Sequence, residues 1–193
     1  MHFELYGCDC ESTGLDPLKN EPIEITFIRL STDECKTWCL KPLNPDNIEA
    51  DALRVNGHKL DDLLHRTAEG RSRYLNPERV LVDMENWLAK DELPSDQRIL
   101  LGHNVHFDRE MLASLWRKCD SYDTFPLNNK YALDTMQIEF FLDHIKGEYG
   151  EGYSLRNLAR NYKVKQDKAH TAEDDTKVMT EIFRHQVKRL IKG

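Results

Sequence analysis

A β-hairpin followed by an alternation of helices and short buried strands is the pattern that most constrains this chain. Residues 23–30 alternate apolar and polar side chains, and residues 35–40 are a hairpin partner across the turn at 31–34. Residues 98–102 form a short apolar run bounded by turn residues, which is typical of a buried strand. A hairpin start with helices and strands alternating after it predicts an α/β domain with a mixed sheet.

The remaining elements follow from apolar periodicity and from the Pro, Gly, Asn and Ser residues that separate them. We expect strands at residues 2–10, 23–30, 35–40, 98–102 and 131–133. We expect helices at residues 47–55, 104–119, 134–146, 154–162 and 172–191, and a further one that opens at Asn76-Pro77. The side chain of Asn104 is predicted to cap the helix at 104–119.

Length and composition narrow the class of protein. With 193 residues, 39% of them hydrophobic, the chain fits one compact domain over residues 1–193. Residues 1–6 lack the basic stretch and apolar core of a signal peptide, and no apolar run approaches the roughly 18 residues of a membrane span. We therefore expect a cytoplasmic protein without membrane contact. The five cysteines lack paired Cys-x2-Cys spacing and are expected to be reduced.

The net charge of −7 argues against non-specific coating of nucleic acid, since such binding needs a broad basic surface. The charge is unevenly spread, because residues 154–193 hold ten Lys and Arg against five Asp and Glu and the residues before them carry −12. Lys163, Lys165 and Lys168 are either an ordinary solvated surface or a patch that attracts phosphates. The acid excess therefore leaves room for a local nucleic-acid site.

Asp9 and Glu11 stand two residues apart on the first predicted strand. Both carboxylates leave the sheet on the same side, about 7 Å apart along the chain. Solvation of an exposed strand end would explain such a pair without any function. The small residues that follow, Ser12 to Gly14, instead let a ligand approach the backbone closely.

Asp108 lies within the apolar stripe of the helix predicted at 104–119. A buried carboxylate has to be neutralised, paired or bound to a cation, because an unpaired buried charge is costly. Two explanations remain open: a salt bridge to a distant basic residue, or a metal ion.

The last predicted helix repeats this arrangement. Helical periodicity turns Asp175 toward the apolar face and Asp174 toward water. Thr171 and Asp174 resemble a capping box, which gives Asp174 a structural task. His170 directly precedes this helix and is either a surface residue or part of the acidic site.

The sequence thus predicts four inward acids: Asp9, Glu11, Asp108 and Asp175. If all four were ionised they would carry a charge of −4, which two divalent cations would cancel. Ligation by oxygen alone suits Mg²⁺ or Mn²⁺ rather than zinc. Two such ions are the usual clamp for displacement at a phosphodiester, and a neutral His170 could accept the proton of the attacking water.

Three segments of the chain resemble, in order and spacing, the three motifs of the DEDD superfamily of 3′-to-5′ exonucleases. They are residues 9–15 (DCESTGL), 102–108 (GHNVHFD) and 170–175 (HTAEDD). The third is similar to the histidine branch (DnaQ-like, DEDDh), because His170 stands five residues before the last acid and Thr171 stands where the other branch has tyrosine. This branch includes the proofreading subunits of bacterial DNA polymerase III, ribonuclease T and oligoribonuclease.

The resemblance implies a ribonuclease H-like fold, with a five-stranded mixed sheet flanked by helices and an antiparallel second strand. It implies that Asp9, Glu11 and Asp175 hold one metal ion, that Asp9 bridges to a second near Asp108, and that His170 is the general base. It implies single-stranded nucleic acid 3′ ends as substrate, with a polymerase or repair protein as the kind of partner. The terminal nucleotide would lie against residues of the first two motifs: Ser12, Thr13, Gly14, Leu15, Asn104 and Phe107.

We therefore expect a Mg²⁺-dependent 3′-to-5′ exonuclease that acts on single-stranded DNA and releases nucleoside 5′-monophosphates. Trimming of RNA ends by the same chemistry is the main alternative, because acceptance of the 2′-hydroxyl depends on details of the pocket. A non-catalytic binding module would lack at least one of the five motif residues, and all five are present. An unrelated metal hydrolase would not account for the three motifs.

Overall fold

The computed structural model describes residues 2–64, 72–166 and 170–192. Its strands are β1 (Glu4–Ser12), β2 (Pro22–Arg29), β3 (Glu34–Cys39), β4 (Arg98–Gly102) and β5 (Ala132–Asp134). Its α-helices are α1 (Ala50–Asn56), α2 (Leu60–Leu64), α3 (Pro77–Leu88), α4 (Val105–Lys118), α5 (Thr135–Lys146), α6 (Leu155–Tyr162) and α7 (Ala172–Lys192). Short 3-10 helices cover Pro45–Asn47, Ala89–Asp91, Ser95–Gln97 and Tyr122–Thr124.

The strands form one sheet in the order β3-β2-β1-β4-β5. β2 is antiparallel to both β1 and β3, whereas β4 is parallel to both β1 and β5. This mixed sheet with its antiparallel second strand confirms the predicted fold class. The last pair between β1 and β4 joins Gly7 and Leu101, so β1 continues beyond its neighbour at the end where its acids lie.

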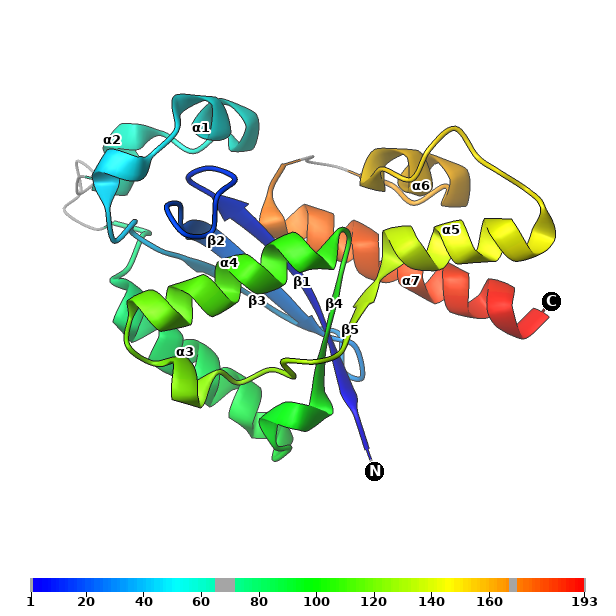
Figure 1. Ribbon diagram of the computed structural model, residues 1–193, viewed down its shortest axis with the longest axis horizontal. Coiled ribbons are helices and arrows are strands. Elements are labelled where there is room, and N and C mark those ends of the chain that lie inside the picture. Colours follow the sequence, from blue (N-terminus) through cyan, green and yellow to red (C-terminus); the bar gives the residue numbers. More distant parts are fainter. Residues whose placement is uncertain (1, 65–71, 167–169, 193) are drawn as a thin grey trace.

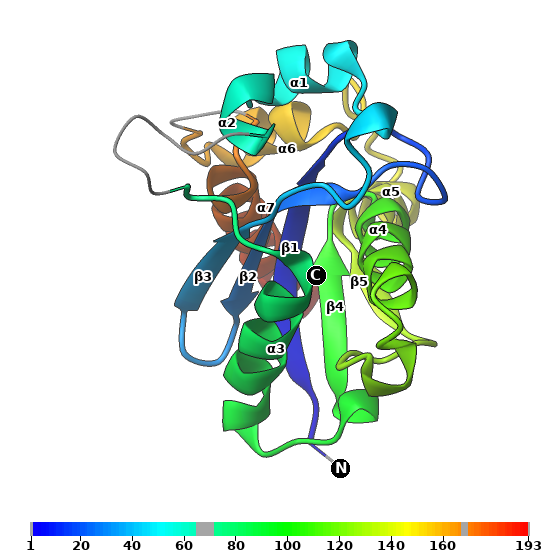
Figure 2. The same ribbon diagram turned by 90° about the vertical axis from the view of Figure 1, so that its left-hand side faces the viewer.

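Helices cover both faces of the sheet. Figure 2 shows α3 and α4 on one face and α7 on the other, while α1 lies beyond the end of β1 (Figure 1). Because side chains alternate along a strand, Tyr6, Cys8 and Cys10 of β1 enter the apolar core beneath α3 and α4. The residues between them, Gly7 and Asp9, face α7. Asp9 therefore points away from the main core.

Gly7 allows α7 to lie close to β1. A Cβ atom at this position would collide with the side chain of Thr180 on α7. The close approach matters for the site, because α7 carries Asp175 one and a half turns before Thr180.

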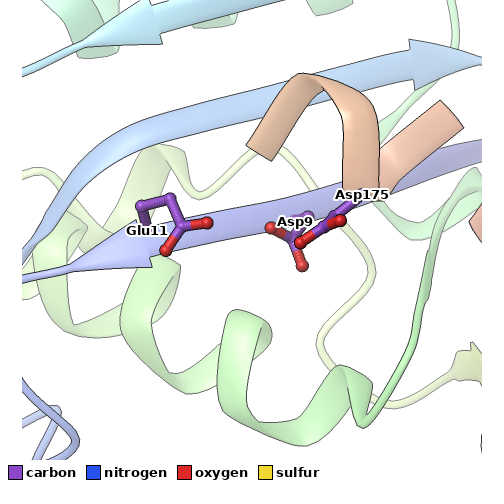
Figure 3. A group of neighbouring side chains, drawn as sticks. All are labelled: Asp9, Glu11 and Asp175. Atoms are coloured by element: carbon purple, nitrogen blue, oxygen red, sulfur yellow. The ribbon is translucent and has the colours of Figure 1, made fainter. Parts of the chain in front are cut away.

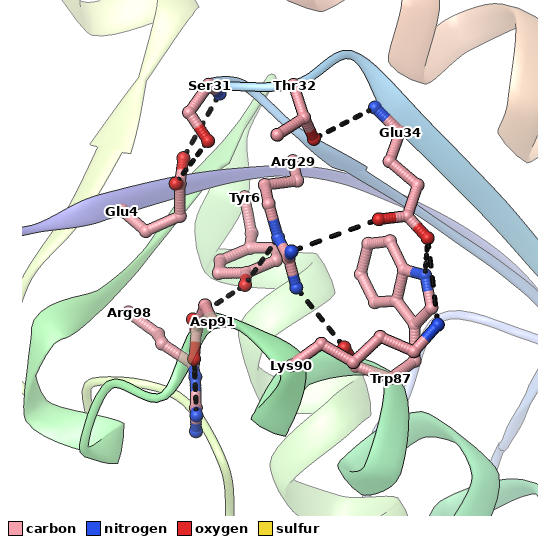
Figure 4. Close-up of polar contacts among 10 residues, drawn as sticks. All are labelled: Glu4, Tyr6, Arg29, Ser31, Thr32, Glu34, Trp87, Lys90, Asp91 and Arg98. Carbon is pink, nitrogen blue, oxygen red and sulfur yellow. Dashed lines mark hydrogen bonds and ion pairs between the residues drawn. The ribbon is translucent and has the colours of Figure 1, made fainter.

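A polar network secures the other end of the sheet (Figure 4). The Tyr6 hydroxyl donates to Asp91 at 2.7 Å and accepts from the Arg29 guanidinium at 3.1 Å. Arg98 forms a buried ion pair with Asp91 at 2.7 Å, and Arg29 also donates to the carbonyl of Trp87. The network joins β1, β2 and β4 to the end of α3, and so fixes the strand that delivers the acids.

The structure confirms the predicted strands and most predicted helices, with three differences. The first helix begins at Ala50 rather than Asn47, and α2 was not predicted because it spans only five residues. The prediction that Asn104 caps α4 through its side chain is wrong. Asn104 has a left-handed backbone (φ 61°) and its side chain makes no capping bond; Asp134 of the neighbouring strand accepts from the amides of Asn104 and Val105 instead.

Candidate active site

Three carboxylates meet where the end of β1 passes the start of α7. One ligand oxygen from each of Asp9, Glu11 and Asp175 lies within 4.8 Å of the other two. Figure 3 shows Asp175 descending from α7 onto Asp9, with Glu11 farther along β1. The strand and helix periods had placed these side chains on inward faces, and the structure brings all three together.

The electrostatics of this group are those of crowded like charges. Burial raises the pKa of Asp9 well above its usual range, and the charges of Asp108 and Glu11 raise it further. Burial, followed by the charges of Asp175 and Glu24, raises the pKa of Glu11 to about 7. A site that disfavours its own negative charge is one that a divalent cation would stabilise.

Asp108 lies beside this group but outside it. Its Oδ1 accepts a hydrogen bond from the Cys10 amide at 3.0 Å. Burial raises the pKa of Asp108 to about 8, against the opposing effect of the Cys10 hydrogen bond. No ion pair joins Asp108 to a basic side chain within residues 2–64, 72–166 and 170–192, and the metal explanation stays a prediction. The partner is the backbone amide between Asp9 and Glu11, on the stretch of β1 that β4 no longer covers.

Glu24 is a further acid at the site that the sequence patterns did not single out. It pairs with Glu11 across β1 and β2, so both side chains lie on the same face of the sheet. Its Oε1 accepts from the Ala172 amide at 3.1 Å, and its Oε2 lies 3.5 Å from His58 Nε2. Burial and then the charge of Arg73 lower the pKa of His58 to about 4. Glu24 therefore fixes the first residue of α7 to β2.

Strand alternation had grouped Glu24 with Thr26 on one face. No sequence signal, however, indicated a contact with α7, 148 residues away.

The segment before α7 is anchored to Asp175. The amide of His170 donates to Asp175 Oδ2 at 3.2 Å, and the side-chain amide of Gln166 donates to Oδ1 at 2.6 Å. His170 has a left-handed backbone (φ 66°) and an exposed side chain. The hydroxyl of Thr171 accepts from the Asp174 amide at 3.3 Å, as the capping pattern predicted. Of the three lysines singled out for phosphate attraction, Lys168 lies outside the described residues.

A cavity of about 270 Å³ adjoins Glu11. Of the six residues predicted to contact a terminal nucleotide, Ser12, Leu15 and Phe107 line it, whereas Thr13, Gly14 and Asn104 are not among the residues that form its wall. Gly14 is needed for packing, since a Cβ atom there would overlap the side chain of Asn20. The opposite wall, which the sequence patterns missed, comes from α1 and the residue before it: Glu49, Asp51, Ala52, Val55 and Asn56.

Asn56 connects this wall to the acidic strand. Its side-chain amide donates to the Ser12 carbonyl at 3.0 Å, and its side-chain oxygen accepts from the His58 amide at 3.2 Å. The Ser12 hydroxyl is likewise engaged, with the carbonyl of Gly14 at 2.6 Å. The surface left to a bound molecule is therefore largely apolar, with Leu15 78% exposed at its edge.

The profile of the RNase_T exonuclease family matches residues 7–183, from β1 into α7. The chain belongs to this exonuclease family. The match encloses the three motifs and places the chain among the DEDD nuclease hydrolases of the DnaQ type. A curated relative, the DNA polymerase III subunit epsilon of Treponema pallidum (strain Nichols), is 26% identical over 183 residues. That alignment covers 94% of this chain and 75% of the relative.

Solved structures of other exonucleases have the same fold. Exonuclease I of E. coli in complex with a dT13 oligonucleotide superposes with a TM-score of 0.72 at 19% identity, over 99% of this chain and 43% of that one. Cell-death related nuclease 4 (CRN-4) superposes with a TM-score of 0.70 at 13% identity, over 97% of this chain and 64% of that one. This chain thus spans about two fifths of the length of the Exonuclease I chain. No helix among the described residues is long and apolar enough to cross a bilayer.

Proposed function

We propose that the protein is a metal-dependent 3′-to-5′ exonuclease that removes nucleoside 5′-monophosphates from the 3′ end of single-stranded DNA. The observation that carries the proposal is the convergence of Asp9, Glu11 and Asp175 within 4.8 Å, beside a cavity that can take a terminal nucleotide. Membership of the exonuclease family supports the reaction class. The whole chain, residues 1–193, would act as one exonuclease domain.

The donor set fits divalent magnesium. All three converging groups are carboxylates, and oxygen ligands of this kind favour Mg²⁺ or Mn²⁺ over softer metals. Asp9, Glu11 and Asp175 would hold one ion, and Asp9 with Asp108 would hold the second. When bound, two such ions would supply Lewis-acid activation of the attacking water and stabilisation of the leaving oxygen.

The chain's own residues supply the rest of the reaction. His170 would accept the proton of the attacking water, a role that an exposed side chain next to the carboxylates can fill. Its anchored backbone holds the residue close to Asp175 while the imidazole stays free to approach the substrate. The terminal nucleotide would lie in the cavity between Leu15, Phe107 and α1.

Two of the comparisons support DNA as the substrate. One relative is a subunit of a DNA polymerase, and one solved neighbour is a complex with a deoxythymidine oligonucleotide. The first of these also supports a polymerase as the class of partner. RNA ends could be cleaved by the same groups, and they form the second arm of the test.

The test is a side-by-side digestion of 5′-labelled single-stranded DNA, single-stranded RNA and a duplex with a mismatched 3′ end. With Mg²⁺ or Mn²⁺ the DNA should shorten stepwise from its 3′ end and release 5′-monophosphates, and EDTA should stop the reaction. Asp9→Ala should abolish turnover and keep the fold. Failure to trim either polymer would overturn the enzymatic proposal, whereas trimming of RNA alone would overturn the assignment to DNA.

A further inference from the structure

An exposed row of aromatic rings lies on the outer face of α5 and on the segment that returns from it. The Phe140 ring packs edge-on against Tyr153 (centroids 5.6 Å apart) and stacks on His144 (6.3 Å, 18° between planes). The His144 ring in turn contacts Tyr149 at 6.5 Å. We call Tyr153, Phe140, His144 and Tyr149 the aromatic track. Phe140 is 52% exposed and Tyr149 60%, so these two rings are open to a ligand, whereas Tyr153 is half-buried against the cluster that holds Leu158 and Ile182.

The track is held in place by the chain itself. His144 lies one turn after Phe140 on α5, which aligns the two rings on one side of the helix. The Tyr149 hydroxyl lies 3.0 Å from His144 Nδ1, and the segment carrying Tyr149 and Tyr153 folds back from the end of α5 toward α6 (Figure 1). A ligand would therefore meet rings that are already ordered, which reduces the entropy lost on binding.

One end of the track adjoins the active site. The Tyr153 backbone is a hydrogen-bond partner of the His103 ring, whose Nδ1 also lies 2.9 Å from the Thr135 hydroxyl. His103 directly precedes Asn104 and the start of α4, which carries Phe107 and Asp108. Figure 1 shows α4 and α5 starting side by side and running in opposite directions. A strand leaving the cavity past the start of α4 would thus meet Tyr153 first.

The acids nearest the aromatic track are buried or ion-paired. The only acids of α5, Glu139 and Asp143, are 5% and 6% exposed and face α7, where Arg189 pairs with both at 2.7 and 2.8 Å. On the returning segment, Glu148 lies 3.5 Å from Arg189 and Glu151 lies 2.6 Å from Arg160. Arg189 balances only one of the three carboxylates that share it, so stacking of bases on the rings, and not attraction of phosphates, would hold a strand here.

We propose that the aromatic track stacks the bases of single-stranded nucleic acid upstream of the 3′ end that the active site holds. The proposal rests on the proposed exonuclease function, because that function supplies the bound 3′ end. Stacking on exposed rings tolerates any base, since every base presents a π-face. The track would therefore lengthen the binding site without adding sequence preference.

Equilibrium binding in EDTA tests the track without turnover. The probes are a fluorescein-labelled deoxytrinucleotide, which occupies only the active site, and a labelled deoxydodecanucleotide, which also reaches the track. Phe140→Ala should weaken binding of the longer probe by about 5- to 100-fold and leave the trinucleotide unchanged. Phe140→Tyr should restore binding, because it keeps an aromatic ring. An RNA dodecanucleotide should show the same loss.

Phe141→Ala is the matched control. Phe141 is the next residue of α5, is 56% exposed, and takes part in no ring contact of the described chain. This variant should bind both probes as the wild type does. The proposal would be overturned if Phe140→Ala bound the dodecanucleotide as tightly as the wild type does. It would also be overturned if Phe140→Ala and Phe141→Ala lost equal affinity for this probe.

A protein interface is the rival use of this face. Loss of self-association in Phe140→Ala, measured by sedimentation with oligonucleotide binding intact, would assign the face to a second copy and overturn the proposal. The two proposals fail separately. A wild type that trims no nucleic acid removes the exonuclease function, while the contrast between long and short probes in EDTA still decides the track.

Discussion

Asp108 Oδ1 accepts a hydrogen bond from the backbone amide of Cys10 at 3.0 Å, across 98 residues of sequence. Cys10 stands between Asp9 and Glu11, and its amide lies beyond the point where β4 stops pairing with β1. An acid on α4 thus replaces a missing strand partner. The contact explains how a carboxylate can be 3% exposed although no basic side chain of the described residues pairs with it, and it fixes the strand that presents Asp9 and Glu11.

Two substitutions separate the anchoring role of Asp108 from its charge. Asp108→Asn keeps an oxygen that can accept the hydrogen bond from the Cys10 amide. The free energy of unfolding of this variant should therefore lie within about 1 kcal/mol of the wild-type value. Without the negative charge, turnover with Mg²⁺ should fall by at least about 100-fold. Asp108→Leu should lose turnover and also about 1–3 kcal/mol of stability, because the amide is left unpaired. Chemical unfolding and oligonucleotide turnover measure the two effects. A fully active Asp108→Asn would reduce Asp108 to a backbone anchor.

In the absence of metal, the free energy of unfolding should fall as the pH rises. The folded-state pKa of Glu11, about 7, exceeds its ordinary value, so the folded protein favours the protonated group. The contribution of Glu11 to stability is complete below about pH 4 and is lost as the pH rises through about 7, with a size of roughly 3 kcal/mol. Thermal unfolding in EDTA from pH 5 to 8 should show this decline. Glu11→Gln should make the decline shallower but not abolish it, because the pKa values of Asp9 and Asp108 are also raised, and Mg²⁺ should stabilise the wild type more at pH 8 than at pH 5. Equal slopes for the two proteins would contradict the assignment.

Glu24 is expected to act as a positioning residue through the Ala172 amide. Glu24→Ala removes the acceptor at the start of α7, and the resulting shift of Asp175 should lower kcat about 10- to 100-fold with little change in KM. Glu24→Gln retains an oxygen for the amide and should recover most of kcat. Glu173→Ala, which removes an exposed acid from the same turn, is the matched control and should leave kcat unchanged. Equal loss in the Ala and Gln variants would show that charge, rather than the hydrogen bond, matters.

His170→Ala should reduce turnover by roughly 10²- to 10⁴-fold if the imidazole is the general base. Thermal stability should stay near that of wild type, because the side chain is exposed and its backbone amide still donates to Asp175. His106→Ala, an exposed histidine on α4, serves as the control. An active His170→Ala enzyme would require another proton acceptor.

Local periodicity was enough to predict the converging acids. Alternation along a strand paired Asp9 with Glu11, and the helical period separated inward Asp175 from Asp174. The contacts that orient them could not be predicted, because they join residues far apart in sequence. Asn104 illustrates the reason: its residue type favours a helix cap, yet Asp134 from β5 occupies that position and tertiary packing overrides the local preference.

The network at the far end of the sheet should affect stability and leave the chemistry intact. Burial alone would raise the pKa of Asp91, but hydrogen bonds from Arg98, the Leu93 amide and Tyr6 lower it below its usual value. Asp91→Ala leaves the buried Arg98 charge unpaired and should cost about 3–5 kcal/mol. Tyr6→Phe removes the hydrogen bonds to Asp91 and Arg29 and should cost at least about 1.5–3 kcal/mol. Urea unfolding measures both losses. Turnover per folded molecule should stay at the wild-type level in each variant, because these residues lie at the opposite end of β1 from Glu11. A fall in turnover beyond the loss of folded protein would show that the network also sets the geometry of the acids.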